Sequence, residues 1–125
     1  MLMNKMTKWM TAIYYTWLAA ILIVSSIPDI GSSEESLLGF DKYAHFIEYL
    51  ILAFLFICMK LARHQKPILK NYFFLAVLLP ALDELHQLFI RGRECSPLDF
   101  SADWAGVSLA FIVYLLLIKF LSIKL

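Results

Sequence analysis

Residues 41–61 read DKYAHFIEYLILAFLFICMKL, and this stretch decides the fold. Every side chain from Leu50 to Met59 is apolar. A helix over residues 43–61, rising about 1.5 Å per residue, is long enough to cross the roughly 30 Å hydrocarbon layer of a bilayer. The first half of the stretch nevertheless carries His45 and Glu48, which are costly at membrane depth and need a structural or functional reason. The stretch therefore predicts a membrane helix with a polar site towards one end.

Three further apolar segments, at residues 9–27, 72–90 and 98–121, have similar lengths. The chain has 125 residues, of which 62% are hydrophobic and only 17% charged, well away from the soluble average. Glycine, proline and serine mark the connections between the segments. We predict an all-α fold, in which residues 1–125 form a single domain built as an integral membrane bundle of four transmembrane helices.

Local signals refine this prediction. Ser96, Pro97 and Asp99 match an N-cap, an N1 proline and an N3 carboxylate, so the fourth helix is expected to begin there, ahead of its most apolar part at 102–121. Pro80 predicts a kink in the third helix, because proline has no N–H to donate. The first segment has the basic flank of a signal peptide, but its apolar run is too long and bulky, so we expect a retained helix.

The cations are distributed unevenly over the two sides of the predicted bundle. Only Lys42, Arg91 and Arg93 lie on one side. Eight lie on the other: Lys5, Lys8, Lys60, Arg63, Lys66, Lys70, Lys119 and Lys124. The positive-inside rule makes the side with eight cations cytoplasmic. We therefore predict that both termini are inside and that the first and third connections, with all ten acidic residues in or near them, are outside.

Ionisable side chains gather on one face of the second helix and near the outer end of the third. At about 100° per residue, five side chains of the second helix fall within an arc of roughly 120°. They are Asp41, Lys42, His45, Glu48 and Tyr49. The third helix and the connection after it contribute Asp83, Glu84, His86, Gln87, Arg91 and Arg93. The first helix contributes no ionisable residue to this set.

The fourth helix adds two acids to the same end of the bundle. Asp99 and Asp103 share a stripe with Gly106 and Ala110. The series Ala102, Gly106 and Ala110 is a small-xxx-small pattern, which allows a neighbouring helix to approach closely. We therefore predict that the second, third and fourth helices enclose an outward-facing polar pocket.

We predict that this pocket binds a ligand, because ionisable groups that several membrane helices bring together more often have a functional role than a purely structural one. The predicted binding residues are Asp41, Lys42, His45, Glu48, Tyr49, Asp83, Glu84, His86, Gln87, Arg91, Arg93, Asp99 and Asp103. The pattern names no catalytic residue, although Glu48, Glu84 and His45 are candidates. We expect no metal ion and no cofactor.

Each part of the cluster also has a structural interpretation. Asp41 and Asp99 can have the simple role of capping or complementing the N-termini of helices. The acids of the second and third helices can pair with the three outer cations in a structural network, and the histidines can be hydrogen-bonded core residues. A mononuclear zinc site with a carboxylate base is a further alternative on ligand types.

Two motifs carry a resemblance to a known family. They are Asp41-Lys42-x-x-His45-x-x-x-Tyr49 and Asp83-Glu84-x-x-Gln87-x-x-x-x-Gly92-Arg93, followed by Leu98-Asp99 and Gly106. At these spacings, residues 41 to about 110 resemble the VanZ-like family, named for a teicoplanin-resistance determinant. The resemblance implies a small helical membrane protein associated with low-level resistance to lipid-bearing glycopeptide antibiotics, and it supplies no enzymatic reaction. It singles out Asp41, Lys42, His45, Tyr49, Glu84, Gln87, Arg93 and Asp99. Asp103 stands where such proteins often carry Asn.

We therefore expect a multi-pass protein of a bacterial cell membrane whose outer pocket binds an amphiphile or an envelope lipid head group. The expected partners are the lipid bilayer and a cell-wall lipid precursor or a lipoglycopeptide. Nucleic acid is not expected, because no basic face is present. In this interpretation Lys42, Arg91 and Arg93 engage an anionic head group.

Two rival functions belong to other classes. The first is a membrane-embedded hydrolase or transferase that acts on a lipid-linked substrate through a carboxylate and histidine or a metal site. The second is a small proton-coupled transporter. The sequence speaks against the transporter, because the inner halves of the four segments carry no ionisable residue short of their cytoplasmic ends.

Overall fold

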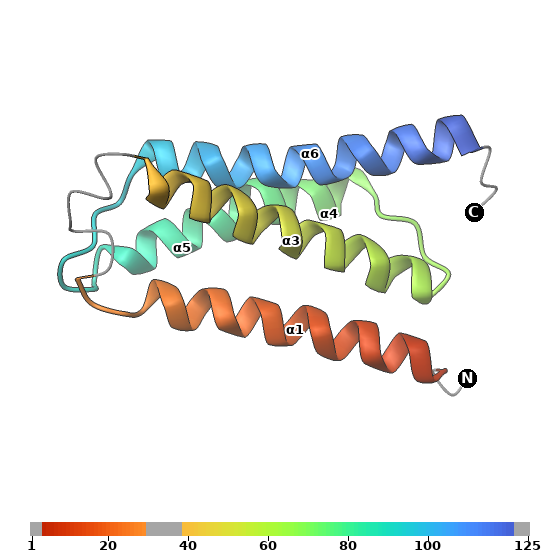
Figure 1. The fold of residues 1–125 in the computed structure, drawn as a ribbon, viewed down its shortest axis with the longest axis horizontal. Coiled ribbons are helices and arrows are strands. Elements are labelled where there is room, and N and C mark those ends of the chain that lie inside the picture. The colour runs from red at the N-terminus through yellow and green to blue at the C-terminus, as the bar shows by residue number, and fades with distance from the viewer. Residues whose placement is uncertain (1–3, 30–38, 122–125) are drawn as a thin grey trace.

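A computed structural model describes residues 4–29 and 39–121, and its described elements are all helices (Figure 1). In chain order they are α1 (Lys5–Ser25), α3 (Phe40–Ala62), α4 (Leu69–Phe73), the π-helix η1 (Phe74–Leu78), α5 (Leu79–Gln87) and α6 (Pro97–Leu121). The prediction of an all-α fold is confirmed.

Three of the helices, α1, α3 and α6, are long and apolar enough to cross a membrane. Their bounds lie within four residues of the predicted segments, because the length of an apolar run sets the length of a membrane helix. Their surfaces expose large apolar side chains such as Ile23, Phe54 and Leu115, as helices facing lipid do. The chain is therefore a multi-pass membrane protein.

The third predicted segment is not one regular α-helix. α4, η1 and α5 follow one another from Leu69 to Gln87, and the N–H of Leu79 donates to the carbonyl of Phe74, five residues back. The buried Pro80 explains this, because its ring would clash with the carbonyl four residues earlier in a regular helix. A π-turn ahead of the proline moves that carbonyl aside. The expected distortion thus takes the form of a π-turn, and a fourth membrane crossing stays a prediction.

The helices run back and forth along the bundle (Figure 1). α3 and α6 pack against each other most extensively, α1 packs along α3, and η1 and α5 also contact α6. The start of α1, the end of α6 and the connection from α3 to α4 lie at one end. The start of α3, the end of α5 and the start of α6 meet at the other end, so this end gathers the polar residues of three helices.

A glycine sets the distance between α3 and α6. A Cβ atom at Gly106 would collide with the carbonyl oxygen of Phe46 and would lie 2.9 Å from the backbone nitrogen of Leu50. Ala110, four residues further along α6, is also buried. The predicted small-residue pattern therefore brings the backbones of the two helices into contact at Gly106.

Two hydrogen bonds attach α1 to α3 at well-separated levels. The Thr7 hydroxyl donates to the carbonyl oxygen of Ala62 at 2.8 Å. The Trp17 indole N–H donates to the carbonyl oxygen of Glu48 at 3.0 Å. α1 therefore supports the bundle from the side of α3.

Gly106→Ala should destabilise the protein, even though alanine favours a helix interior over glycine by about 1 kcal/mol. The added methyl group meets the α3 backbone and not the end of a flexible side chain, so we expect a net loss of about 1–3 kcal/mol in the free energy of unfolding. Thermal melting of the detergent-solubilised protein, followed by circular dichroism, measures this loss. Leu109→Ala, at an exposed position of α6, is the control. A Gly106→Ala protein that melts at or above the wild-type temperature would contradict the close contact.

Candidate functional site

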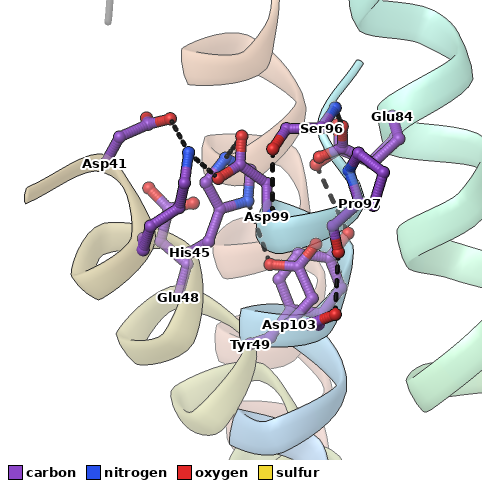
Figure 2. Close-up of polar contacts among 12 residues, drawn as sticks. Asp41, His45, Glu48, Tyr49, Glu84, Ser96, Pro97, Asp99 and Asp103 are labelled. Carbon is purple, nitrogen blue, oxygen red and sulfur yellow. Dashed lines mark hydrogen bonds and ion pairs between the residues drawn. The ribbon is translucent and has the colours of Figure 1, made fainter. Parts of the chain in front are cut away.

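The candidate site lies where α3 begins, α5 ends and α6 begins (Figure 2). As predicted, α6 starts at Pro97, and the Ser96 hydroxyl oxygen accepts the Asp99 N–H at 3.4 Å. The Ser96 N–H in turn donates to Glu84 Oε2 at 2.8 Å. This bond ties the connection before α6 to α5 and so helps to position the first two turns of α6, from which Asp99 and Asp103 reach α3.

Three charged residues, which we name the outer triad, join α3 to α6: Asp41, Lys42 and Asp99. Lys42 Nζ forms an ion pair with Asp99 Oδ1 and a longer one, at 3.4 Å, with Asp41 Oδ2. The Lys42 side chain is 32% exposed, whereas that of Asp99 is only 4% exposed. The ammonium group therefore bridges two carboxylates, and both aspartates do more than complement a helix N-terminus.

One turn further along α3, His45 lies between two aspartates of α6 (Figure 2). Its Nδ1 is 2.9 Å from Asp103 Oδ1, and its Nε2 is 3.9 Å from Asp99 Oδ2. All three side chains are buried. Only the contact with Asp103 is short enough for a hydrogen bond, and it fixes the orientation of the imidazole so that Nε2 faces Asp99.

α5 supplies a further wall of buried polar residues, Asp83, Glu84 and Gln87. The Tyr49 hydroxyl of α3 donates to Asp83 Oδ2 at 3.4 Å. Among the described residues, several buried polar atoms here have no hydrogen-bond partner, namely Asp83 Oδ1, Glu84 Oε1, Gln87 Nε2 and Asp103 Oδ2. Buried polar atoms without partners cost free energy, and most such atoms in proteins are satisfied. Their concentration in one place favours a binding site over a purely structural network.

Three of the predicted site residues contact the end of α1 or the residues just after it. His86 is exposed, and its Nε2 lies 2.9 Å from Ser26 Oγ. Arg91 is exposed and pairs with Asp29 at 3.0 Å. Arg93 donates from Nη2 to a backbone carbonyl of α1 at 3.0 Å. The structural-network interpretation expected Arg91 to neutralise acids of α3 and α5. Arg91 instead pairs with Asp29.

Sequence reasoning missed two members of this region. Ser96 was predicted only as an N-cap, yet its backbone N–H is the partner of Glu84. No side-chain pattern reveals a backbone donor of this kind. Asp29 was not predicted as a partner of Arg91, although an acid just after the first apolar segment was an available signal.

The assembled site is rich in acids and can accept hydrogen bonds, take up a proton or hold a cation. Asp103 orients His45 as a carboxylate orients a catalytic or metal-binding histidine. The half-buried Glu48 lies below His45 on α3 (Figure 2). Two sets of three side chains have ligand atoms within 4.8 Å of one another and so could hold a metal ion: Asp41, His45 and Asp99, and His45, Asp83 and Asp103.

Glu84→Ala should loosen the start of α6, because the Ser96 N–H loses its acceptor. A hydrogen bond to a charged group contributes about 1.5–3 kcal/mol, so the Ser96 amide should exchange about tenfold faster or more. Hydrogen–deuterium exchange of peptides that cover residues 94–100 measures this rate. His86→Ala, on the exposed side of the same helix, should leave the rate unchanged. Equal protection in Glu84→Ala and wild type would contradict this role of Glu84.

The chain was also compared with known proteins. A family model described as VanZ/LLP1 matches residues 2–119. No curated protein and no solved structure matches the chain. The matched range includes both sequence motifs and every residue of the site described above.

Proposed function

The chain belongs to the VanZ/LLP1 family, and on that premise we propose that it binds the polar head of an amphiphile at the outer end of its bundle. The observation that carries the proposal is that Glu84 Oε1 and Gln87 Nε2, two buried polar atoms on α5, have no hydrogen-bond partner among the described residues. Such atoms gain free energy when a ligand supplies the missing hydrogen bonds. Exposed apolar side chains on the surrounding helices allow the tail of the ligand to stay in lipid while its head enters the site.

The chemistry of the site favours a head group that combines hydrogen-bond donors with an anion. The carboxylate of Glu84 accepts hydrogen bonds from hydroxyl or amine groups, and the side-chain amide of Gln87 donates them. Lys42 is partly exposed and can exchange a carboxylate for a phosphate oxygen. A cell-wall lipid precursor carries both kinds of group. We therefore propose such a precursor, or a lipoglycopeptide, as the ligand, and low-level teicoplanin resistance as the phenotype.

This function requires the site to face outwards. We propose that the segment from α4 to α5 completes a fourth crossing and that both termini face the cytoplasm. In support, the start of α1, the end of α6 and the connection from α3 to α4 share one end of the bundle (Figure 1). That end carries most of the cations, as the positive-inside rule requires of a cytoplasmic face.

Lys42→Gln should reduce teicoplanin resistance to that of cells without the protein, because the site loses the cation that would meet the head group. The measurement is the minimal inhibitory concentration of teicoplanin, beside that of a glycopeptide without a lipid tail, whose value should not change. Lys42→Arg keeps the charge and should retain resistance.

Lys119→Gln is the matched control, since it removes the same charge from an exposed position near the opposite end of the bundle. Membrane abundance of each variant is measured by immunoblot. If Lys42→Gln keeps full resistance, or loses resistance only in proportion to abundance, head-group binding at this site is wrong.

One observation favours a second function, a hydrolase or transferase for a lipid-linked substrate. The Asp103–His45 hydrogen bond at 2.9 Å orients an imidazole as in a general base. The purified protein would then release the head group from lipid-linked precursors, and His45→Gln would lower the rate by about 10²–10⁴-fold. Mass spectrometry of the products measures the release. Equal product from wild type and His45→Gln would rule this function out.

A further inference from the structure

We propose that His45, Asp83 and Asp103, which we name the inner triad, bind one divalent metal ion. The three side chains come from α3, α5 and α6, and their ligand atoms lie within 4.8 Å of one another. With bonds of about 2.1 Å to the metal, pairs of ligand atoms around an ion lie about 3–4 Å apart. His45 Nδ1 lies 2.9 Å from Asp103 Oδ1, so the imidazole and the Asp103 carboxylate are already next to each other.

Two carboxylate oxygens of the inner triad are buried without partners. Asp83 is 3% exposed and Asp103 is 0% exposed. Within residues 4–29 and 39–121, Asp83 Oδ1 and Asp103 Oδ2 accept no hydrogen bond. A buried carboxylate oxygen is costly unless a donor or a cation satisfies it. These two oxygens therefore point to a ligand that the protein itself does not supply.

The charge of the inner triad is also unbalanced. Across the described part of the chain, no lysine or arginine forms an ion pair with Asp83 or Asp103, and His45 is the one partner of Asp103. If His45 is protonated, its one positive charge compensates only one of the two carboxylates, so the inner triad keeps a net negative charge. A divalent ion balances both carboxylates, which matters most at membrane depth, where an uncompensated charge is expensive.

The outer triad is a weaker candidate for the same ion. With His45, its two aspartates also form a set within 4.8 Å. However, the Lys42 ammonium already bridges Asp41 and Asp99, so those carboxylates have their cation. The inner triad has none.

Neighbouring side chains hold the ligands as second-sphere groups do in metal proteins. The Tyr49 hydroxyl donates to Asp83 Oδ2 and so leaves Oδ1 for the metal. When His45 Nδ1 binds the metal, Nε2 carries the proton and faces Asp99 Oδ2 at 3.9 Å. Histidine ligands commonly direct their second N–H to a carboxylate in this way. One imidazole nitrogen with two carboxylates suits Zn²⁺ or Mn²⁺ better than Mg²⁺ or Ca²⁺, which prefer oxygen ligands alone.

The test uses the full chain in detergent micelles, stripped with a chelator, incubated with Zn²⁺ or with Mn²⁺ and then desalted. We expect one ion retained per chain, measured by elemental mass spectrometry, and a higher melting temperature with metal than without. Asp83→Asn and Asp103→Asn should each weaken binding by about tenfold or more and abolish the rise in melting temperature. No cell-wall lipid precursor and no lipoglycopeptide is present, so the result does not depend on the binding of either head group.

Two matched variants locate the ion. Asp41→Asn removes a carboxylate of the outer triad, and Glu94→Gln removes an exposed one, so neither should change the metal content. Binding that is lost in Asp41→Asn but kept in Asp83→Asn overturns the proposal.

A measurement on the wild-type protein provides a check that needs no variant and so does not depend on whether the variants fold. X-ray absorption at the zinc edge should show one imidazole nitrogen with oxygen ligands and no sulfur. Sulfur ligands would overturn the proposal. So would a metal content after desalting that is no higher than that of protein never incubated with metal.

Discussion

The site depends on how closely α6 approaches α3 at Gly106. With the two backbones in contact there, the preceding turns of α6 bring Asp103 and then Asp99 against the face of α3 that carries His45. A larger residue at position 106 would push the helices apart and lengthen each of these polar contacts. A packing contact without any charge therefore sets the distances on which the electrostatics of the site depend.

Helix lengths and the polar face of α3 were predictable, because membrane thickness and helical periodicity govern them. The position of His86 could not be predicted from its neighbours in the chain, because it is exposed and contacts Ser26. The buried stripe of α5 runs through Pro80 and Gln87, and at 100° per residue His86 lies about 110° from its centre, so its exposure follows from angle and not from proximity in the chain. Arg91 lies beyond the end of α5, where periodicity no longer applies. Its partner Asp29 comes from another connection, so only the tertiary structure reveals the pair.

The polar residues are arranged in two layers with different charge balance. In the outer layer, Lys42 compensates Asp41 and Asp99 and remains partly exposed. In the inner layer, His45 pairs with Asp103, and the described residues provide no cationic partner for Asp83. The inner layer therefore costs more free energy to bury than the outer layer, and a ligand would lower that free energy more. Lys42 lies between the inner layer and the exposed end of the bundle.

The distribution of polar groups over the helices also constrains biosynthesis. α1 has no charged residue after Lys8, so it is stable in lipid as soon as it leaves the ribosome and the insertion machinery. α3 emerges with its acids and His45, whose partner on α6 is synthesised 58 residues later. Released alone into lipid, α3 would carry these groups uncompensated. Pairing with α6 therefore stabilises α3 in the bilayer only after residues up to Asp103 have been synthesised.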